Sequence, residues 1–144
     1  MEYGRTSHAV YELKYHFVWV PKYRRMVLKE PIARDLKRIF VGTAERYGFK
    51  IVEQEVMADH VHLFVSAPPR YSPAELVKIL KSVSWMRLMK ERPEVKETVW
   101  GGALWSSGYF VRATGDMVTS DIIRRYIRYQ RANDEGPKQS SFRF

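Results

Sequence analysis

Two histidines, two residues apart, are the first residues in the chain whose types and spacing could support chemistry. His60 and His62 lie in the run HVHLFV, where histidine and then apolar residues alternate as in a β-strand. Residues i and i+2 of a strand face the same side of a sheet, so the two imidazoles lie side by side and form half of a metal site. Such a pair can also be purely structural, and a metal site needs a third ligand.

A second set of candidate residues lies on the last predicted helix. Tyr126 and Gln130 share one stripe with Ile123 and Ile127, so that a phenol and an amide lie on the apolar side of this helix. The amide is out of place on such a stripe. Either Tyr126 packs in the core while Gln130 satisfies backbone groups, or both residues serve chemistry on the surface that the stripe contacts.

The composition restricts the class of protein. The chain has 144 residues, and 25 Lys plus Arg against 16 Asp plus Glu give a formal net charge of +9. With 45% hydrophobic residues the chain can build a core, so the excess charge belongs to a folded surface and a polyanion is the expected partner. The chain has no cysteine, which excludes zinc ribbons, iron–sulfur sites and thiol nucleophiles. Because no apolar run reaches about 18 residues and no signal-peptide pattern opens the chain, we expect no membrane partner and a cytoplasmic location.

The hydropathy pattern predicts a single domain over residues 1–144, with no internal repeat. Four strands and three helices are predicted in the order β, α, β, β, α, β, α. In chain order they are a strand over 10–20, a helix that starts at Pro31 and ends before Gly48, strands over 49–57 and 60–66, a helix over 73–90, a strand around 109–111 and a helix over about 120–133. The tail, residues 134–144, is polar and interrupted by Gly and Pro, and we expect it to be flexible.

Local signals predict where several of these elements start and end. Ala58 and Asp59 form a short polar step between two strands, which predicts an antiparallel hairpin. Ser72, followed by Glu75 three residues later, predicts a capping box at the start of the second helix. Ser120 is predicted to cap the terminal helix.

The order of elements predicts an α+β fold. Its simplest packing is a ferredoxin-like, or RRM-like, split βαββαβ antiparallel sheet with two helices on one face. The other face of such a sheet is left open. We expect the terminal helix or a ligand to cover it.

Four sequence blocks, taken together, resemble the single-tyrosine HUH transposases of small insertion sequences and their REP-associated relatives. The blocks follow one another along nearly the whole chain. They are YHFVWVPKYRR (15–25), ADHVHLFVSAPP (58–69), LWSSGYFVRATG (104–115) and RRYIRYQ (124–130).

The resemblance implies roles for four residues. His60, His62 and Gln130 match the ligands of a divalent metal, Mg²⁺ or Mn²⁺, and Tyr126 matches the nucleophile of a terminal catalytic helix. The implied reaction is attack of the Tyr126 hydroxyl on a DNA phosphate, which leaves a 5′-phosphotyrosine link and a free 3′-OH and can be reversed to join strands. A phenol with an ordinary pKa of about 10 is a poor nucleophile at neutral pH, so a metal that polarises the phosphoryl oxygen fits this chemistry.

The resemblance also implies partners. The substrate would be single-stranded DNA with subterminal hairpins, and the protein would be a homodimer in which the terminal helix of one subunit can complete the active site of the other. Assembly of the site within one subunit is equally compatible with the sequence. The candidate DNA-binding residues are basic or aromatic and follow predicted strands or lie on them: Lys22, Tyr23, Arg24, Arg25 and Arg112.

Three further residues stand near these candidates. Tyr129 gives the helix a second tyrosine, but only Tyr126 lies four residues before Gln130, and Tyr129 is interpreted as a packing or stacking residue. His16 lies on a neighbouring predicted strand and could approach the histidine pair, but a lone histidine on a strand is usually structural, and it is given no role. Asp59 is interpreted as a turn residue that could also support a metal ligand.

Other functions remain open at this point. A domesticated DNA nuclease that cuts at repeats would keep the same four residues. A non-catalytic RRM-like module for single-stranded nucleic acid would use the same kind of sheet, but the sequence has no RNP-like run of aromatic residues, and this function leaves the histidines and Tyr126 unexplained. Rolling-circle initiators and relaxases are usually longer than 144 residues.

Overall fold

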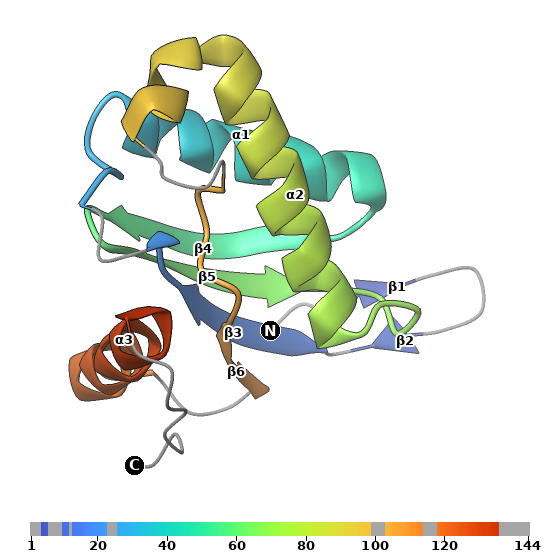
Figure 1. Cartoon of the computed structure of the whole chain (residues 1–144). Coiled ribbons are helices and arrows are strands. Elements are labelled where there is room, and N and C mark those ends of the chain that lie inside the picture. The colour runs from blue at the N-terminus through green and yellow to red at the C-terminus, as the bar shows by residue number, and fades with distance from the viewer. Residues whose placement is uncertain are drawn as a thin grey trace.

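A four-stranded antiparallel sheet with the strand order β4-β5-β3-β6 organises the chain (Figure 1). This computed structural model describes residues 4–5, 10–11, 13–22, 26–98, 103–113 and 118–135. The strands of the main sheet are β3 (Lys14–Trp19), β4 (Lys50–Met57), β5 (His60–Ser66) and β6 (Phe110–Ala113). A separate two-stranded pair is formed by β1 (Gly4–Arg5) and β2 (Val10–Tyr11).

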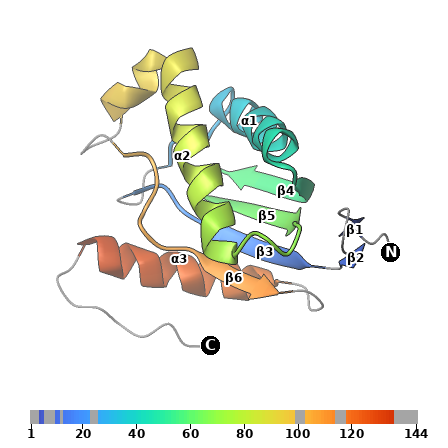
Figure 2. The ribbon, with the colours of Figure 1, turned by 90° about the vertical axis from the view of Figure 1, so that its right-hand side faces the viewer.

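Helices cover both faces of this sheet. The helices α1 (Ile32–Tyr47) and α2 (Pro73–Glu91) lie on one face, and α3 (Ser120–Glu135) lies on the other (Figures 1 and 2). A short 3-10 helix, η2 (Pro93–Thr98), follows α2. The predicted α+β fold is confirmed, and the terminal helix takes the face that the first two helices leave open.

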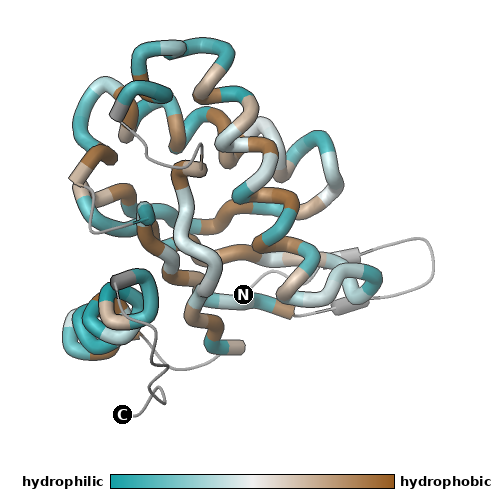
Figure 3. Tube along the Cα trace, in the orientation of Figure 1, coloured by the Kyte–Doolittle hydropathy of each residue, from teal (hydrophilic) through white to brown (hydrophobic). Residues whose placement is uncertain are grey.

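The main core lies between the sheet and helices α1 and α2. On β5 the residues Val61, Leu63 and Val65 are fully buried and face this core, while the residues between them are only partly buried. Phe17 and Trp19 of β3 enter the same core. Figure 3 shows apolar residues on the strands and along α1 and α2, whereas α3 is mostly hydrophilic, as expected of a helix with one narrow apolar stripe.

Most of the predicted elements agree with the structure, although the strand predicted around 109–111 is found at Phe110–Ala113. The hairpin, the capping box and the three helices are found where the sequence predicts them. The first predicted strand, residues 10–20, is divided, because β2 pairs with β1 while β3 starts only at Lys14. The prediction that Ser120 caps α3 is wrong: Ser120 is itself helical, and the Thr119 hydroxyl accepts a hydrogen bond from the backbone N–H of Ile122 at 3.3 Å.

The predicted flexible tail, 134–144, begins inside α3, since residues 134 and 135 are helical. Residues 136–144 lie outside the described part of the chain. Within the residues that the structure describes, none of the helices combines the length and apolar character that a membrane span requires.

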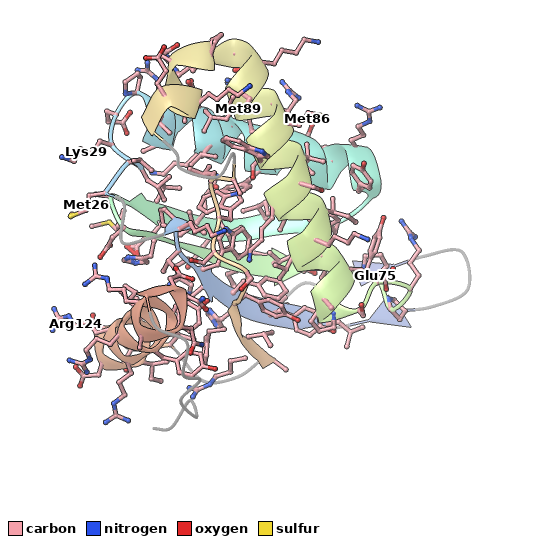
Figure 4. The ribbon with its side chains drawn as sticks, in the orientation of Figure 1. Met26, Lys29, Glu75, Met86, Met89 and Arg124 are labelled. Atoms are coloured by element: carbon pink, nitrogen blue, oxygen red, sulfur yellow. The ribbon has the colours of Figure 1, made fainter. Side chains whose placement is uncertain are left out.

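The capping box of α2 yields a test of local stability. The backbone N–H of Glu75 donates to the Ser72 hydroxyl at 3.1 Å, and the Ser72 N–H donates to the Glu75 carboxylate at 3.0 Å, at the start of the helix where Figure 4 labels Glu75. Ser72→Ala removes the first bond and should lower the free energy of unfolding by about 1 kcal/mol in a urea titration.

The matched control for this test is Ser82→Ala in the same helix. The Ser82 hydroxyl is exposed and donates only to backbone carbonyls of its own helix. Ser82→Ala should leave the free energy of unfolding within about 0.5 kcal/mol of the wild type. Equal losses in the two variants would contradict the capping role of Ser72.

Candidate active site

The apolar stripe of α3 packs against the sheet face opposite to the main core. Tyr126 is 2% exposed and Ile127 is 7% exposed, and both lie in a second core with Val18 of β3 and Phe110 of β6. The stripe continues to Gln130, whose amide is buried at 3% exposure. The polar side of the helix faces solvent, and Arg124 is exposed on it (Figure 4). The predicted stripe is therefore confirmed, and the two polar groups on it are buried.

His60 and His62 share the sheet face that α3 covers. The Nδ1–H of His60 donates to the Asp59 carboxylate at 2.9 Å, because a carboxylate can only accept. This bond leaves Nε2 as the nitrogen of His60 that can bind a metal. The other oxygen of Asp59 lies 3.5 Å from the Arg131 guanidinium of α3, so the turn before β5 is joined to the helix.

A third histidine, to which the sequence analysis gave no role, contacts this pair. Nδ1 of His16 lies 3.2 Å from Nε2 of His62, and the His16 ring stacks on Phe64 with centroids 4.3 Å apart. Burial lowers the pKa of both rings. The charge of Arg112 lowers the pKa of His16 further, and the charge of His16 lowers the pKa of His62 further. Both imidazoles are thereby kept neutral at neutral pH, which is the form that binds a metal.

The two histidines line neighbouring cavities between the sheet and α3. His62 lines a cavity of about 570 Å³ together with His16 and Glu53. His60 and Asp59 line another of about 350 Å³. Three side chains line both cavities: Glu55 of β4, and Ser120 and Ile123 of α3.

Tyr126 and Gln130 lie beside each other but apart from these cavities. The Tyr126 hydroxyl donates to Oε1 of Gln130 at 3.3 Å. Burial raises the pKa of the Tyr126 phenol, and the charge of Asp134 adds to this effect. Neither Tyr126 nor Gln130 lines either cavity. Among the described residues, no three His, Asp or Glu side chains are grouped so that they could hold a metal ion.

The candidate DNA-binding residues are only partly described. Lys22 is half-buried, and its backbone N–H donates to the Leu104 carbonyl at 2.9 Å. Arg112 lies on β6 opposite His16, and its guanidinium is 5.9 Å from the centre of the Phe110 ring. Tyr23, Arg24 and Arg25 lie outside the described residues.

A partly buried lysine near Gln130 was missed in the sequence. Nζ of Lys81 donates to the carbonyls of Ser106 at 2.7 Å and Gly108 at 2.8 Å, in the segment before β6. Burial lowers the pKa of Lys81 to about 8, while the Asp134 charge acts in the opposite direction. The one available signal was that Lys81 lies next to the apolar stripe of its helix, four residues after Val77.

Most of the chain is similar in sequence to a known family. Residues 9–130 match the family described as "Transposase IS200 like". The chain belongs to the IS200-like transposase family. It is 39% identical over 130 residues to the ISDra2 transposase TnpA of Deinococcus radiodurans, which covers 90% of this chain and 92% of that protein. It is 30% identical over 135 residues to the transposase for insertion sequence element IS200 of Salmonella typhimurium, with 94% and 88% covered.

Solved structures of transposases share the fold. A crystal structure of a Deinococcus radiodurans protein described as a transposase superposes with a TM-score of 0.79 at 39% identity, over 90% of this IS200-like transposase and 98% of that chain. A REP-associated tyrosine transposase bound to a REP hairpin superposes with a TM-score of 0.52 at 15% identity, over 92% of this chain and 72% of that one. The second likeness concerns the fold alone. The predicted resemblance to insertion-sequence transposases is confirmed.

The partly buried Lys81 predicts how the stability of this IS200-like transposase depends on pH. The pKa of Lys81 is about 8 in the folded chain and 10.5 in the unfolded one, so between these values the unfolded chain binds more protons. The free energy of unfolding should therefore rise with pH over this window, by up to about 3 kcal/mol from Lys81 alone.

Urea titrations of the wild type and of Lys81→Met at pH 7.5 and pH 10 measure this contribution. Other titrating groups contribute to both proteins, so the difference between them isolates Lys81. A wild type that gains no more stability than Lys81→Met between the two pH values would contradict the prediction.

Proposed function

We propose that this IS200-like transposase cleaves and rejoins single-stranded DNA through a covalent 5′-phosphotyrosine link on Tyr126. His60, His62 and Gln130 are the proposed ligands of one Mg²⁺ or Mn²⁺ ion. The observation that carries the proposal is that a pair of imidazoles lines the space beneath the helix that bears Tyr126 and Gln130, in a chain of a transposase family.

His60 and His62 are in a form that can bind a metal, whereas Gln130 is engaged in another contact. Asp59 leaves Nε2 of His60 available, and the lowered pKa of His62 favours its neutral, ligating form. The amide oxygen of Gln130 is a suitable third ligand for a hard cation, but in this arrangement it accepts the hydrogen bond of Tyr126. A bound ion would polarise a phosphoryl oxygen of the DNA and stabilise the charge that develops on it.

The proposed reaction balances in atoms and protons. The Tyr126 oxygen attacks phosphorus, and the bond between phosphorus and the 3′ oxygen breaks. The phenol gives up its proton and the departing oxygen gains one to become a 3′-OH, so that the reverse reaction can join strands. Because burial raises the pKa of Tyr126, its hydroxyl is protonated at neutral pH and has to be exposed to DNA and to a proton acceptor before it reacts.

The separation of Tyr126 from the histidines supports a rearrangement of α3. Tyr126 is 2% exposed and lines neither cavity, so its hydroxyl is not in position to attack a phosphate bound beside His60 and His62. In the proposed mechanism α3 either moves over its own sheet or docks on the sheet of a second subunit. A homodimer in which α3 is exchanged would bring Tyr126 and Gln130 of one subunit to the histidines of the other.

The proposed substrate is single-stranded DNA that carries a hairpin. The net charge of +9 favours a polyanion, and Arg112 lies on the same sheet face as the histidines. The structural neighbour described as a REP-associated tyrosine transposase was solved with a REP hairpin, which supports the same kind of ligand here. Lys22, Tyr23, Arg24 and Arg25 are further proposed DNA contacts.

The nucleophile is tested by two matched tyrosine variants. Tyr126→Phe should abolish metal-dependent cleavage of a labelled single-stranded hairpin oligonucleotide, with activity reduced at least about 10⁴-fold, because it removes the attacking oxygen. Tyr129→Phe, three residues away on the same helix, should retain cleavage within a few-fold. Both variants should still bind the oligonucleotide in a gel-shift assay. Loss of cleavage in Tyr129→Phe alone would move the nucleophile to that residue.

Exchange of α3 is tested by mixing two inactive proteins. Tyr126→Phe lacks the proposed nucleophile, and the double variant His60→Ala/His62→Ala lacks the proposed metal ligands. In a mixed dimer with exchanged helices, the histidines of the first protein would meet Tyr126 of the second. We expect the mixture to recover cleavage that neither protein shows alone.

Two further outcomes of this mixing experiment are informative. A mixture that stays inactive, although different affinity tags on the two proteins co-purify and so show mixed dimers, would mean that each site assembles within one subunit. Full activity of the histidine double variant on its own would contradict the metal site.

A further inference from the structure

We propose that Asp134 is a positioning residue that orients the side-chain amide of Gln130, so that the amide oxygen is the atom presented to a metal and to Tyr126. Nothing in the sequence analysis assigned a role to Asp134. The inference rests on the proposed function, since it concerns the third ligand of the proposed metal site.

The contact between Asp134 and Gln130 decides which way the amide points. Nε2 of Gln130 donates to Oδ1 of Asp134 at 3.1 Å. A carboxylate only accepts hydrogen bonds, so it selects the amide orientation with nitrogen toward Asp134 and oxygen away from it. Divalent Mg²⁺ and Mn²⁺ bind the oxygen of an amide and not its NH₂ group, so only this orientation is productive.

The carboxylate of Asp134 is itself held by the segment before β6. Ser106 is buried, at 1% exposure, and its hydroxyl donates to the second oxygen of Asp134. Lys81 of α2 fixes the same segment through the carbonyls of Ser106 and Gly108. In the docked position of α3, Ser106 therefore holds Asp134, and Asp134 in turn holds the amide of Gln130.

The space on the other side of the amide is set by a glycine. A Cβ added at Gly108 would overlap Oε1 of Gln130 and would lie 3.6 Å from the Tyr126 hydroxyl. The amide oxygen therefore occupies room that only glycine provides, and the Tyr126 hydroxyl donates to it there. Tyr126, Gln130 and Asp134 are spaced four residues apart on one side of α3, so their order in the sequence forms one chain of hydrogen bonds.

A carboxylate also orients His60, which is another proposed ligand of the metal. Asp59 accepts from Nδ1 of His60 and thereby selects Nε2 as the free nitrogen. In the same way, Asp134 accepts from Nε2 of Gln130 and thereby leaves the amide oxygen as the ligand atom. Loss of such a hydrogen-bonding partner behind a metal ligand typically weakens metal affinity about 10- to 100-fold.

The orientation is tested first in the free protein by nuclear magnetic resonance. The chain has three glutamines, Gln54, Gln130 and Gln139, so selective ¹⁵N labelling gives three side-chain NH₂ pairs, and Gln130→Ala assigns one of them. In Asp134→Ala the hydrogen exchange of the Gln130 pair should become about tenfold faster, as expected for one lost hydrogen bond. Asp121→Ala removes an exposed carboxylate from the same helix and should leave this pair unchanged.

The consequence for metal is tested by the Mn²⁺ concentration that gives half-maximal cleavage of a single-stranded hairpin oligonucleotide. Asp134→Ala should raise this concentration about 10- to 100-fold. Asp134→Asn keeps an acceptor oxygen for Gln130 and should restore most of the affinity. Asp134→Ala should add no further loss to Gln130→Ala, because it acts through that residue.

Three outcomes separate the inference from the function on which it rests. Unchanged exchange of the Gln130 NH₂ pair in Asp134→Ala would overturn the inference. So would reduced cleavage at every Mn²⁺ concentration without a shift of the half-maximal point, since this would indicate a structural role only. Absence of cleavage by the wild type would overturn the proposed function and the ligand role of Gln130, whereas the exchange rates would still decide whether Asp134 orients the amide.

Discussion

The docking of α3 on the open face of the sheet is the contact on which the candidate site depends. Tyr126 and Ile127 pack against Val18 and Phe110, and full burial of side chains of this size contributes about 1.5 to 3 kcal/mol each. The same contact encloses the cavities that His60 and His62 line. It also buries a phenol and an amide, whose polar groups must then find partners within the protein. The hydrogen bonds from Tyr126 through Gln130 to Asp134 satisfy that requirement.

The docked helix stabilises the fold and at the same time restrains the proposed chemistry. In the docked position the Tyr126 phenol is buried, has a raised pKa and is separated from the histidine cavities. The apolar stripe is narrow, since Ile122, Ile123 and Tyr129 at its edges are only partly buried. A helix held by so few apolar side chains leaves the sheet at lower cost than α1 or α2, which share the main core. The proposed exchange or movement of α3 makes use of this difference.

Much of the fold and some of the site could be predicted from the sequence, because these features depend on local patterns. Alternation placed His60 and His62 on one face of a central strand, and helical spacing placed Tyr126 beside Gln130. The sequence allowed His16 to approach the pair, but it could not show the contact with His62 itself, since this depends on the register between two strands whose contacting residues are 46 positions apart. The partners of Asp134 and Lys81 are set in the same way by tertiary packing. The cap of α3 was misplaced by one residue because Thr119 and Ser120 are both suitable and only the backbone decides between them.

Mass mapping of the wild-type protein tests whether Tyr126 becomes covalently attached to DNA. The protein would be incubated with a single-stranded hairpin oligonucleotide and Mg²⁺ or Mn²⁺, denatured, and digested with nuclease and protease. We expect a nucleotide remnant joined through a 5′ phosphate to a peptide that contains Tyr126, and no such peptide when a chelator is present. A remnant on Tyr129 or on another residue, or cleaved DNA without any covalent peptide, would contradict it.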